Sequence, residues 1–257
     1  MNDLTNDPNF LKLAPENFTV HNDESPMLIE TFVELMKHFY NMGWMRGSGG
    51  AMGCISGNRL MISPSSLQKE RMKESDVYVY DLIKKALQQK PINRRITVSS
   101  CATLFTLIMH HTGSECVIHT HSKAANLITQ LISGPTFEIS HQEYIKGIYN
   151  PFSGHNLRYD DTLVIPIIDN KPSENQLLQP IAETLDGYPQ TVAVLVRNHG
   201  LFVWGPTWEA TKIMVECIDY LLDLSIDMIK LDKPLVKEEE VPNVAERSDY
   251  LKTVFNP

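Results

Sequence analysis

Hydrophobic residues along the chain follow two patterns, one with the 3.6-residue period of amphipathic helices and one of short apolar runs typical of strands. The first helical stretch opens at Ser25 and Pro26, which suit an N-cap and a first turn, and Gly43 is placed to end it. Its apolar residues have helical spacing: Leu28, Phe32, Leu35, Met36 and Phe39. The same period predicts further helices over residues 99–111, 122–131, 174–185 and 208–229.

Short apolar runs between these helices predict strands. They cover residues 54–55, 60–62, 77–80, 115–119, 163–168, 192–196 and 201–204. The first two flank Ser56-Gly57-Asn58, a turn sequence that indicates a hairpin. The last two are expected to pair across Asn198-His199-Gly200.

The length of 257 residues leaves one or two domains open. Helices and strands alternate from residue 25 to 230 without a repeat or a linker rich in proline and glycine, which favours one α/β domain. Residues 1–24 are polar and aperiodic, and we expect a loose N-terminal tail. Residues 231–257 are rich in charge and are expected to form a C-terminal tail.

Charge and hydropathy exclude several classes of partner. Lys and Arg number 23 against 31 Asp and Glu, a net charge of −8 that argues against general nucleic-acid binding. No apolar run approaches the about 20 residues of a membrane-spanning helix, so no membrane partner is expected. The N-terminus lacks the basic and apolar regions of a signal peptide, which favours a cytoplasmic protein. Its cysteines should then remain thiols: Cys54, Cys101, Cys116 and Cys217.

Three histidines form a candidate metal site. His119 and His121 close the apolar strand at 115–119, and residues two apart in a strand point to the same face, so both imidazoles can bind one ion. His199 is the best candidate for a third ligand, because it follows the strand at 192–196 and precedes Gly200. Three neutral imidazoles with an open position are typical of catalytic zinc. An isolated His-X-His, however, is more often a chance occurrence.

Two further residues have ordinary and functional interpretations. Glu143 lies in a polar loop, where a carboxylate is usually just solvated. It would matter if it faced the metal, because it could then move a proton to or from a substrate carbon. Cys101, just inside the helix at 99–111, is more often a small buried residue than a functional thiol.

Glycine and serine clusters are candidate anion sites. The loop Gly47-Ser48-Gly49-Gly50 can offer several N–H groups to an anion, although a bare turn is the simpler interpretation. Ser65-Ser66 adds a pair of hydroxyls. Ser99-Ser100 lies at a helix N-terminus that favours phosphate, or only caps that helix. The run at 68–71, Gln-Lys-Glu-Arg, is more typical of a solvated face.

Taken in order, these motifs resemble the class II aldolase/adducin family, over about residues 27–230. The segments that carry the resemblance are 47–50, 62–66, 68–71, 117–125, 141–147, 158–161, 194–200 and 203–208. Three of them are more specific, and are similar to the family's dehydratase branch: His-Gln-Glu-Tyr-Ile-Lys-Gly at 141–147, Arg-Tyr-Asp-Asp at 158–161 and the run at 68–71.

The resemblance implies a fold, an assembly and a set of site residues. The fold is a three-layer α/β/α domain with a central, mainly antiparallel sheet, and the assembly is a homotetramer with active sites near subunit interfaces. His119, His121 and His199 match the ligands of one Zn²⁺ per subunit. The other matching residues are the catalytic acid/base Glu143, Cys101 at the substrate site, and the phosphate-binding residues Gly47, Ser48, Gly49, Gly50, Ser65 and Ser66.

Three positions depart from the family's pattern. Ala51 and Ser66 stand where glycine is usual, and Gly53 stands where serine is usual. The departures bear on the detailed phosphate contacts, and leave the metal ligands and Glu143 unaffected.

The implied activity is a zinc-dependent dehydration in methionine salvage. The substrate would be a small sugar phosphate, 5-methylthioribulose 1-phosphate, and the products 5-methylthio-2,3-dioxopentyl phosphate and water. A class II aldolase that cleaves a ketose 1-phosphate is the first alternative, and a non-enzymatic, adducin-like interaction module is the second. An intact set of histidines with Glu143 argues against the second alternative.

Overall fold

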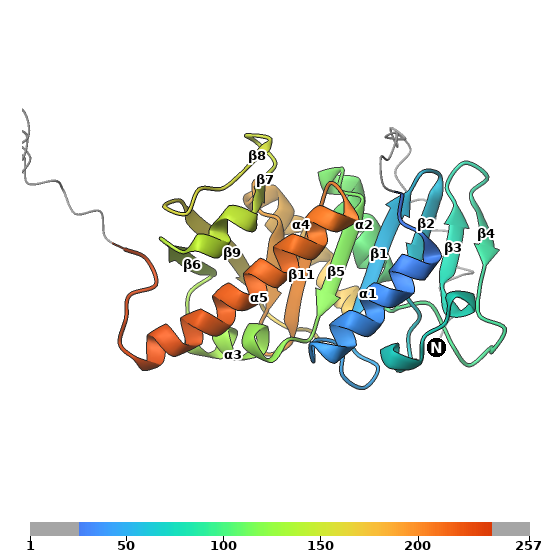
Figure 1. Cartoon of the computed structure of the whole chain (residues 1–257), viewed down its shortest axis with the longest axis horizontal. Coiled ribbons are helices and arrows are strands. Elements are labelled where there is room, and N and C mark those ends of the chain that lie inside the picture. The colour runs from blue at the N-terminus through green and yellow to red at the C-terminus, as the bar shows by residue number, and fades with distance from the viewer. Residues whose placement is uncertain (1–25, 238–257) are drawn as a thin grey trace, which may run out of the picture.

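The computed structural model describes residues 26–237, so the expected N-terminal tail and most of the C-terminal tail lie outside the described residues. A nine-stranded sheet runs through the molecule in the order β4-β3-β2-β1-β5-β11-β10-β9-β6 (Figure 1). Its strands are β1 Ala51–Ser56, β2 Arg59–Ile62, β3 Tyr78–Asp81, β4 Ala86–Gln89, β5 Cys116–Thr120, β6 Thr136–Ser140, β9 Thr162–Ile168, β10 Ala193–Val196 and β11 Gly200–Gly205.

All neighbouring strands of this sheet are antiparallel except β9 and β10, which confirms the expected mainly antiparallel sheet. The hairpin expected around Ser56-Gly57-Asn58 joins β1 to β2, and β10 pairs with β11 as expected. A separate two-stranded ribbon consists of β7 Tyr149–Asn150 and β8 His155–Asn156.

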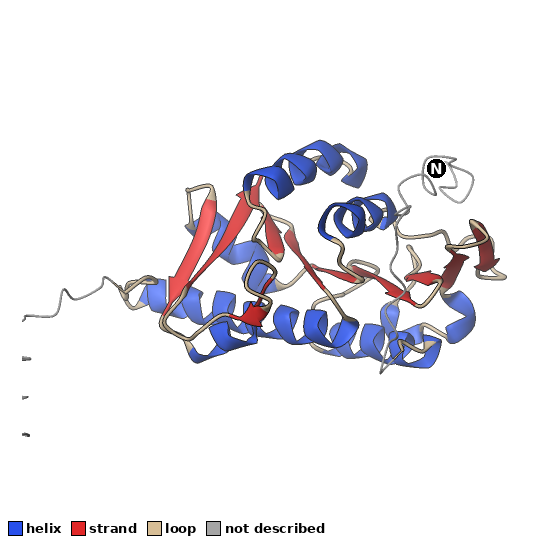
Figure 2. Cartoon of the chain, turned by 90° about the horizontal axis from the view of Figure 1, so that it is seen from above, coloured by secondary structure: helices blue, strands red, loops and turns tan. Residues whose placement is uncertain are grey.

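Helices cover both faces of the sheet, which gives the three layers (Figure 2). One face is covered by α1 Ile29–Asn41, α3 Lys123–Leu131 and α5 Trp208–Lys230, and the other by α2 Ala102–Thr112 and α4 Leu178–Gly187. Short 3₁₀ turns are η2 Lys69–Arg71, η3 Glu74–Asp76, η4 Glu143–Gly147 and η5 Glu174–Leu177. No helix within residues 26–237 is long and apolar enough to span a bilayer.

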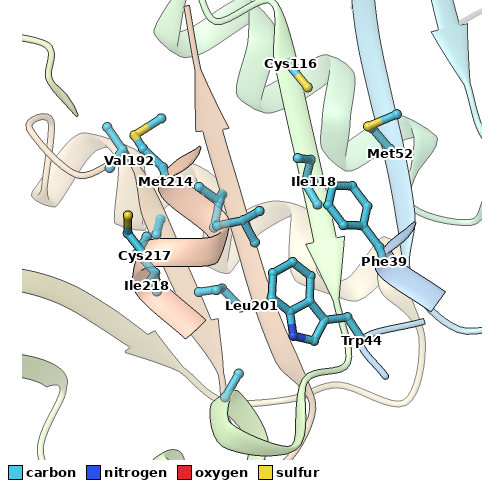
Figure 3. Close-up of a cluster of buried hydrophobic side chains, with 14 of the residues drawn as sticks. Phe39, Trp44, Met52, Cys116, Ile118, Val192, Leu201, Met214, Cys217 and Ile218 are labelled. Carbon is cyan, nitrogen blue, oxygen red and sulfur yellow. The ribbon is translucent and has the colours of Figure 1, made fainter. Parts of the chain in front are cut away.

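The alternation of side chains along each strand fills two separate cores. Along β5, Cys116 and Ile118 face α1 and α5, where they pack with Phe39 and Met214 (Figure 3). Val117 faces the opposite side, against the core that α2 and α4 cover. Because successive residues alternate between the two faces, the candidate metal ligand His119 lies on the side of α2 and α4.

Helix starts differ from the expected ones for local reasons. The first helix begins at Ile29, and its expected cap, Ser25, lies outside the described residues. The helix expected from residue 99 begins at Ala102, because the Ser99 hydroxyl accepts a hydrogen bond from the Cys101 N–H at 3.2 Å in a turn that precedes it. The helix expected from residue 174 begins as the 3₁₀ turn η5 and becomes α-helical only at Leu178.

Candidate metal centre and phosphate loops

The pairing of β5 with β11 brings the three histidines together. His119 lies in β5 opposite Phe202 of β11, His121 directly follows β5, and His199 lies in the turn that leads into β11. The Nε2 atom of His121 is 3.0 Å from Nε2 of His119 and 3.0 Å from Nε2 of His199. All three candidate ligand atoms lie within 4.8 Å of one another. The three nitrogens therefore converge on one point.

Contacts on the far side of two rings fix their orientation. Nδ1 of His119 donates to the Leu201 carbonyl at 3.1 Å, and the ring stacks on Phe202 with centroids 3.9 Å apart. Nδ1 of His199 is 3.1 Å from Oδ1 of Asn170, an amide oxygen that accepts. Because each Nδ1 carries the proton, each Nε2 keeps a lone pair for a metal ion.

The histidines are uncharged at neutral pH. Burial, with the neighbouring imidazoles, lowers the pKa of His119 well below its ordinary value. Burial and then His199 lower the pKa of His121 to about 4, although part of that residue is open to solvent. Burial also lowers the pKa of His199. Convergent neutral imidazoles are the donor set that a divalent metal such as zinc requires, so these residues fit the ion.

A half-buried carboxylate on α5, that of Asp219, holds the backbone beside His121. The His121 N–H donates to the Trp44 carbonyl at 2.8 Å, and Trp44 Nε1 donates to Asp219 at 2.9 Å. The other oxygen of Asp219 accepts from the Ser122 hydroxyl, which also caps α3 by accepting from Ala124 N–H. Burial raises the pKa of Asp219, and these two hydrogen bonds oppose the rise. Asp219 therefore holds both Trp44, which binds the His121 backbone, and Ser122, which follows His121 in the chain.

The turn before β11 is anchored by Arg197. Its guanidinium donates to three carbonyls at the end of α3 and just beyond it, those of Thr129, Ile132 and Gly134, at 2.6, 2.9 and 3.2 Å. Gly200, the first residue of β11, lies so close to the Thr120 carbonyl that a β-carbon would collide with it. The position of His199 is thus set on both sides by backbone contacts.

The glycine and serine loops come together beside the histidines. A β-carbon on Gly49 would lie 2.5 Å from Nδ1 of His121, so the loop at 47–50 abuts a candidate ligand. Ser65 N–H donates to the Thr97 carbonyl at 2.7 Å, and Ser99 N–H donates to the Ser63 carbonyl at 3.2 Å. These bonds join the second loop to the segment that leads into α2.

The departures from the family's pattern have local consequences. Ala51 lies buried in β1, paired with His119, and its methyl group is accommodated there. Gly53 faces α2, where a β-carbon would lie 2.8 Å from the Phe105 ring. Ser66 has a φ of 58°, a left-handed conformation that costs a residue with a side chain about 1 kcal/mol.

Cys101 lies buried at the start of α2. Burial, followed by the charge of Glu174, raises the pKa of its thiol to about 12. The side chain is therefore a neutral thiol at physiological pH, close enough to Lys69 and Glu174 for their charges to act on it.

Lys69 differs from the expectation for the run at 68–71. A solvated face was expected, but this lysine is fully buried, with an exposed fraction of 0%. Its ammonium donates to the Ser48 carbonyl at 3.0 Å and to the Leu67 carbonyl at 3.2 Å. The interpretation of the run as solvated was wrong for this residue because the turn η2 packs against α1 instead of facing solvent.

Glu143 is not brought to the histidines within one chain. It follows the end of β6, and its exposed carboxylate forms an ion pair with Lys146 at 2.5 Å. Thr136, at the start of β6, pairs with Pro166 near the end of β9. The next residue of β9, Ile167, pairs with Leu195 near the end of β10. The end of β10 leads to His199, whereas Glu143 follows the end of β6, so the two residues lie at opposite ends of the strands.

A cavity of about 360 Å³ opens beside His121 and His199. Its other lining residues come mainly from the segment after β9 and from η5: Asn126, Asn170, Lys171, Pro172, Ser173, Glu174, Leu177 and Asn198. Sequence reasoning missed Glu174 and Asn170, because neither belongs to a recognisable motif. The cavity gives a small polar ligand access to the histidine cluster.

With this fold and site, the chain is a member of the Class II Aldolase and Adducin N-terminal domain family, whose model matches residues 30–226. It is 66% identical over 256 residues to a probable methylthioribulose-1-phosphate dehydratase of Caenorhabditis elegans, covering 99% of this chain and 97% of that protein. It is 46% identical over 198 residues to the methylthioribulose-1-phosphate dehydratase of Mus musculus, covering 77% and 82%. An L-fuculose 1-phosphate aldolase has a similar structure, with a TM-score of 0.62 at 18% identity, covering 86% of this chain and 95% of that one.

Replacing His199 by alanine should remove the metal site, because two imidazoles alone hold a divalent ion weakly. We expect the His199→Ala protein to retain its fold but to lose most of its bound metal in elemental analysis. His155→Ala, which removes an exposed histidine from β8, is the matched control. Full metal occupancy in the His199→Ala protein would eliminate His199 as a ligand.

Replacing Asp219 by alanine should loosen the site without touching a ligand. The change leaves the Trp44 and Ser122 donors unpaired, at a cost of about 1–3 kcal/mol each. We expect a lower urea midpoint and a zinc affinity reduced by about tenfold or more. Asp223→Ala, at an exposed position of the same helix, should change neither. Unaltered zinc affinity in Asp219→Ala would show that Asp219 does not position His121.

Proposed function

We propose that the chain is a hydro-lyase of methionine salvage that acts in the cytoplasm. It converts 5-methylthioribulose 1-phosphate to 5-methylthio-2,3-dioxopentyl phosphate and water. The observation that carries the proposal is the cluster of three convergent, neutral imidazoles beside two loops suited to an anion. The full-length relative named a probable methylthioribulose-1-phosphate dehydratase supports the choice of substrate.

In this proposal, His119, His121 and His199 hold one zinc ion. When bound, the ion supplies Lewis acidity toward the ketone and hydroxyl oxygens of the substrate. Backbone N–H groups of the loop at 47–50, with the hydroxyls of Ser65 and Ser66, hold the phosphate ester at the other end. The neutral thiol of Cys101, which lies within range of the charges of both Lys69 and Glu174, is assigned to contact the carbon chain.

The reaction removes a proton from the carbon next to the ketone and hydroxide from the following carbon. The enol that results becomes a second ketone, so the two ketones lie side by side in the product. A general acid/base is needed to take the first proton and to deliver a proton to the departing hydroxyl, and a carboxylate can serve. We assign that role to Glu143.

Because Glu143 lies at the opposite end of the strands from the histidines of its own chain, we infer that it acts on the site of another subunit. A homotetramer with sites at subunit interfaces would place the exposed turn η4 of one copy over the histidines of the next. Its exposure and its single ion pair with Lys146 leave the carboxylate free to make such a contact. The assembly and the role of Glu143 are thus one proposal.

The direct test is incubation of purified, metal-assayed protein with 5-methylthioribulose 1-phosphate, followed by mass spectrometry. We expect a product that has lost one water, and no formation of that product after the metal is removed by a chelator. Carbon–carbon cleavage products would instead assign the chain to the aldolases. Absence of any turnover with metal bound would favour an adducin-like interaction module.

Mixing two inactive variants tests the role of Glu143. The Glu143→Gln protein should keep its fold and zinc but lose most turnover, and the His199→Ala protein should be inactive for lack of metal. In tetramers assembled randomly from both, half of the sites have intact histidines and half of those meet an intact Glu143. We therefore expect about one quarter of the unaltered activity to return. Mixed tetramers as inactive as their parents would show that Glu143 does not act across subunits.

A further inference from the structure

Lys69 is unusual among the basic residues of residues 26–237, because it is the only Lys or Arg that is buried. Its ammonium has three N–H donors, and two of them are used by the Ser48 and Leu67 carbonyls. Neither partner carries a charge. Among the described residues Lys69 forms no ion pair, so its positive charge is held in the interior without a counterion within 4 Å.

Burying an unpaired ammonium is costly, and proteins usually place a negative charge near it. Burial lowers the pKa of Lys69 to about 8, while Cys101 and Glu70 raise it slightly against this effect. The group remains mainly protonated at neutral pH. A site next to it that binds an anion would supply the missing negative charge.

The two carbonyls bound by Lys69 belong to the two candidate phosphate loops. Ser48 lies in the loop at 47–50, and Leu67 directly follows Ser65 and Ser66. Because Lys69 holds these two carbonyls, their partial negative charges point toward the ammonium and away from an anion bound on the outer side of the loops. The lysine thus connects the two loops through hydrogen bonds on their inner side.

We propose that Lys69 is a positioning residue for the substrate phosphate, holding both loops in register and placing a buried positive charge behind the bound anion. The lysine does not touch the phosphate, since its side chain has no exposed surface. It acts through the backbone of the loops and through its electric field, which burial leaves poorly screened. The inference rests on the proposed function for the identity of the anion, but not for the existence of an anion site.

The test compares Lys69→Met with Arg71→Met, which removes the same charge from an exposed position of the same turn. Three quantities are measured for each zinc-loaded protein: KM and kcat for 5-methylthioribulose 1-phosphate, binding of inorganic sulfate by calorimetry, and zinc content. In Lys69→Met, KM and the sulfate Kd should both rise about tenfold or more, the effect expected from losing a buried charge and its hydrogen bonds. Zinc content should stay unchanged, kcat should change much less than KM, and Arg71→Met should match the unaltered protein.

A second variant separates anion binding from folding. Lys69→Gln keeps N–H donors for the carbonyls but carries no charge, and we expect it to bind sulfate as weakly as Lys69→Met. Sulfate affinity equal to that of the unaltered protein in either folded variant would overturn the proposal. If sulfate binding behaves as expected while the unaltered protein does not dehydrate the substrate, the proposed function fails and the anion site stands.

The unaltered protein gives a third readout. Sulfate keeps its charge over about pH 7 to 10, whereas Lys69 loses its proton near pH 8. The titratable groups that interact with Lys69 are Cys101, His121 and Glu70. Cys101 has a pKa of about 12 and His121 one of about 4, so neither changes its charge over that range. Sulfate affinity should fall as pH rises through about 8, and a flat profile would contradict the proposal.

Discussion

The register between β5 and β11 is the constraint on which the rest of the site depends. It places His119 opposite Phe202 and brings Gly200 against the Thr120 carbonyl. A slip of one residue would turn His119 to the other face of the sheet. Both strands are buried in the middle of the sheet, with different core residues on each face, so the hydrophobic pattern that folds the protein also fixes the candidate ligands.

Around this pairing, burial influences which side chains carry a charge. The histidines are kept neutral, which leaves their nitrogens available to a cation. A short distance away Lys69 stays mainly protonated, because backbone carbonyls solvate its ammonium. The substrate in the proposed reaction has a ketone at one end and a phosphate at the other. The two environments match those ends, which explains how a chain of net charge −8 can hold a phosphate ester.

The sequence allowed much of the fold and part of the site to be predicted. Strand alternation predicted that His119 and His121 share a face, and the position before Gly200 predicted His199 as the third candidate ligand. Both signals are local in the sequence. The exposed, polar edge strand β4 was not predicted, because it lacks an apolar run. Lys69 was missed because local composition cannot show that a turn packs under α1. The distance of Glu143 from the histidines depends on the order and direction of β6, β9 and β10, which no local pattern encodes.

We propose that three imidazoles, and no sulfur, hold the zinc ion. X-ray absorption at the zinc edge of the purified protein measures this directly. We expect three imidazole nitrogens at about 2.0–2.1 Å from the zinc and a further oxygen from solvent. A sulfur shell at about 2.3 Å would make the buried Cys101 a ligand and would contradict the assignment, as would a zinc ion without imidazole neighbours.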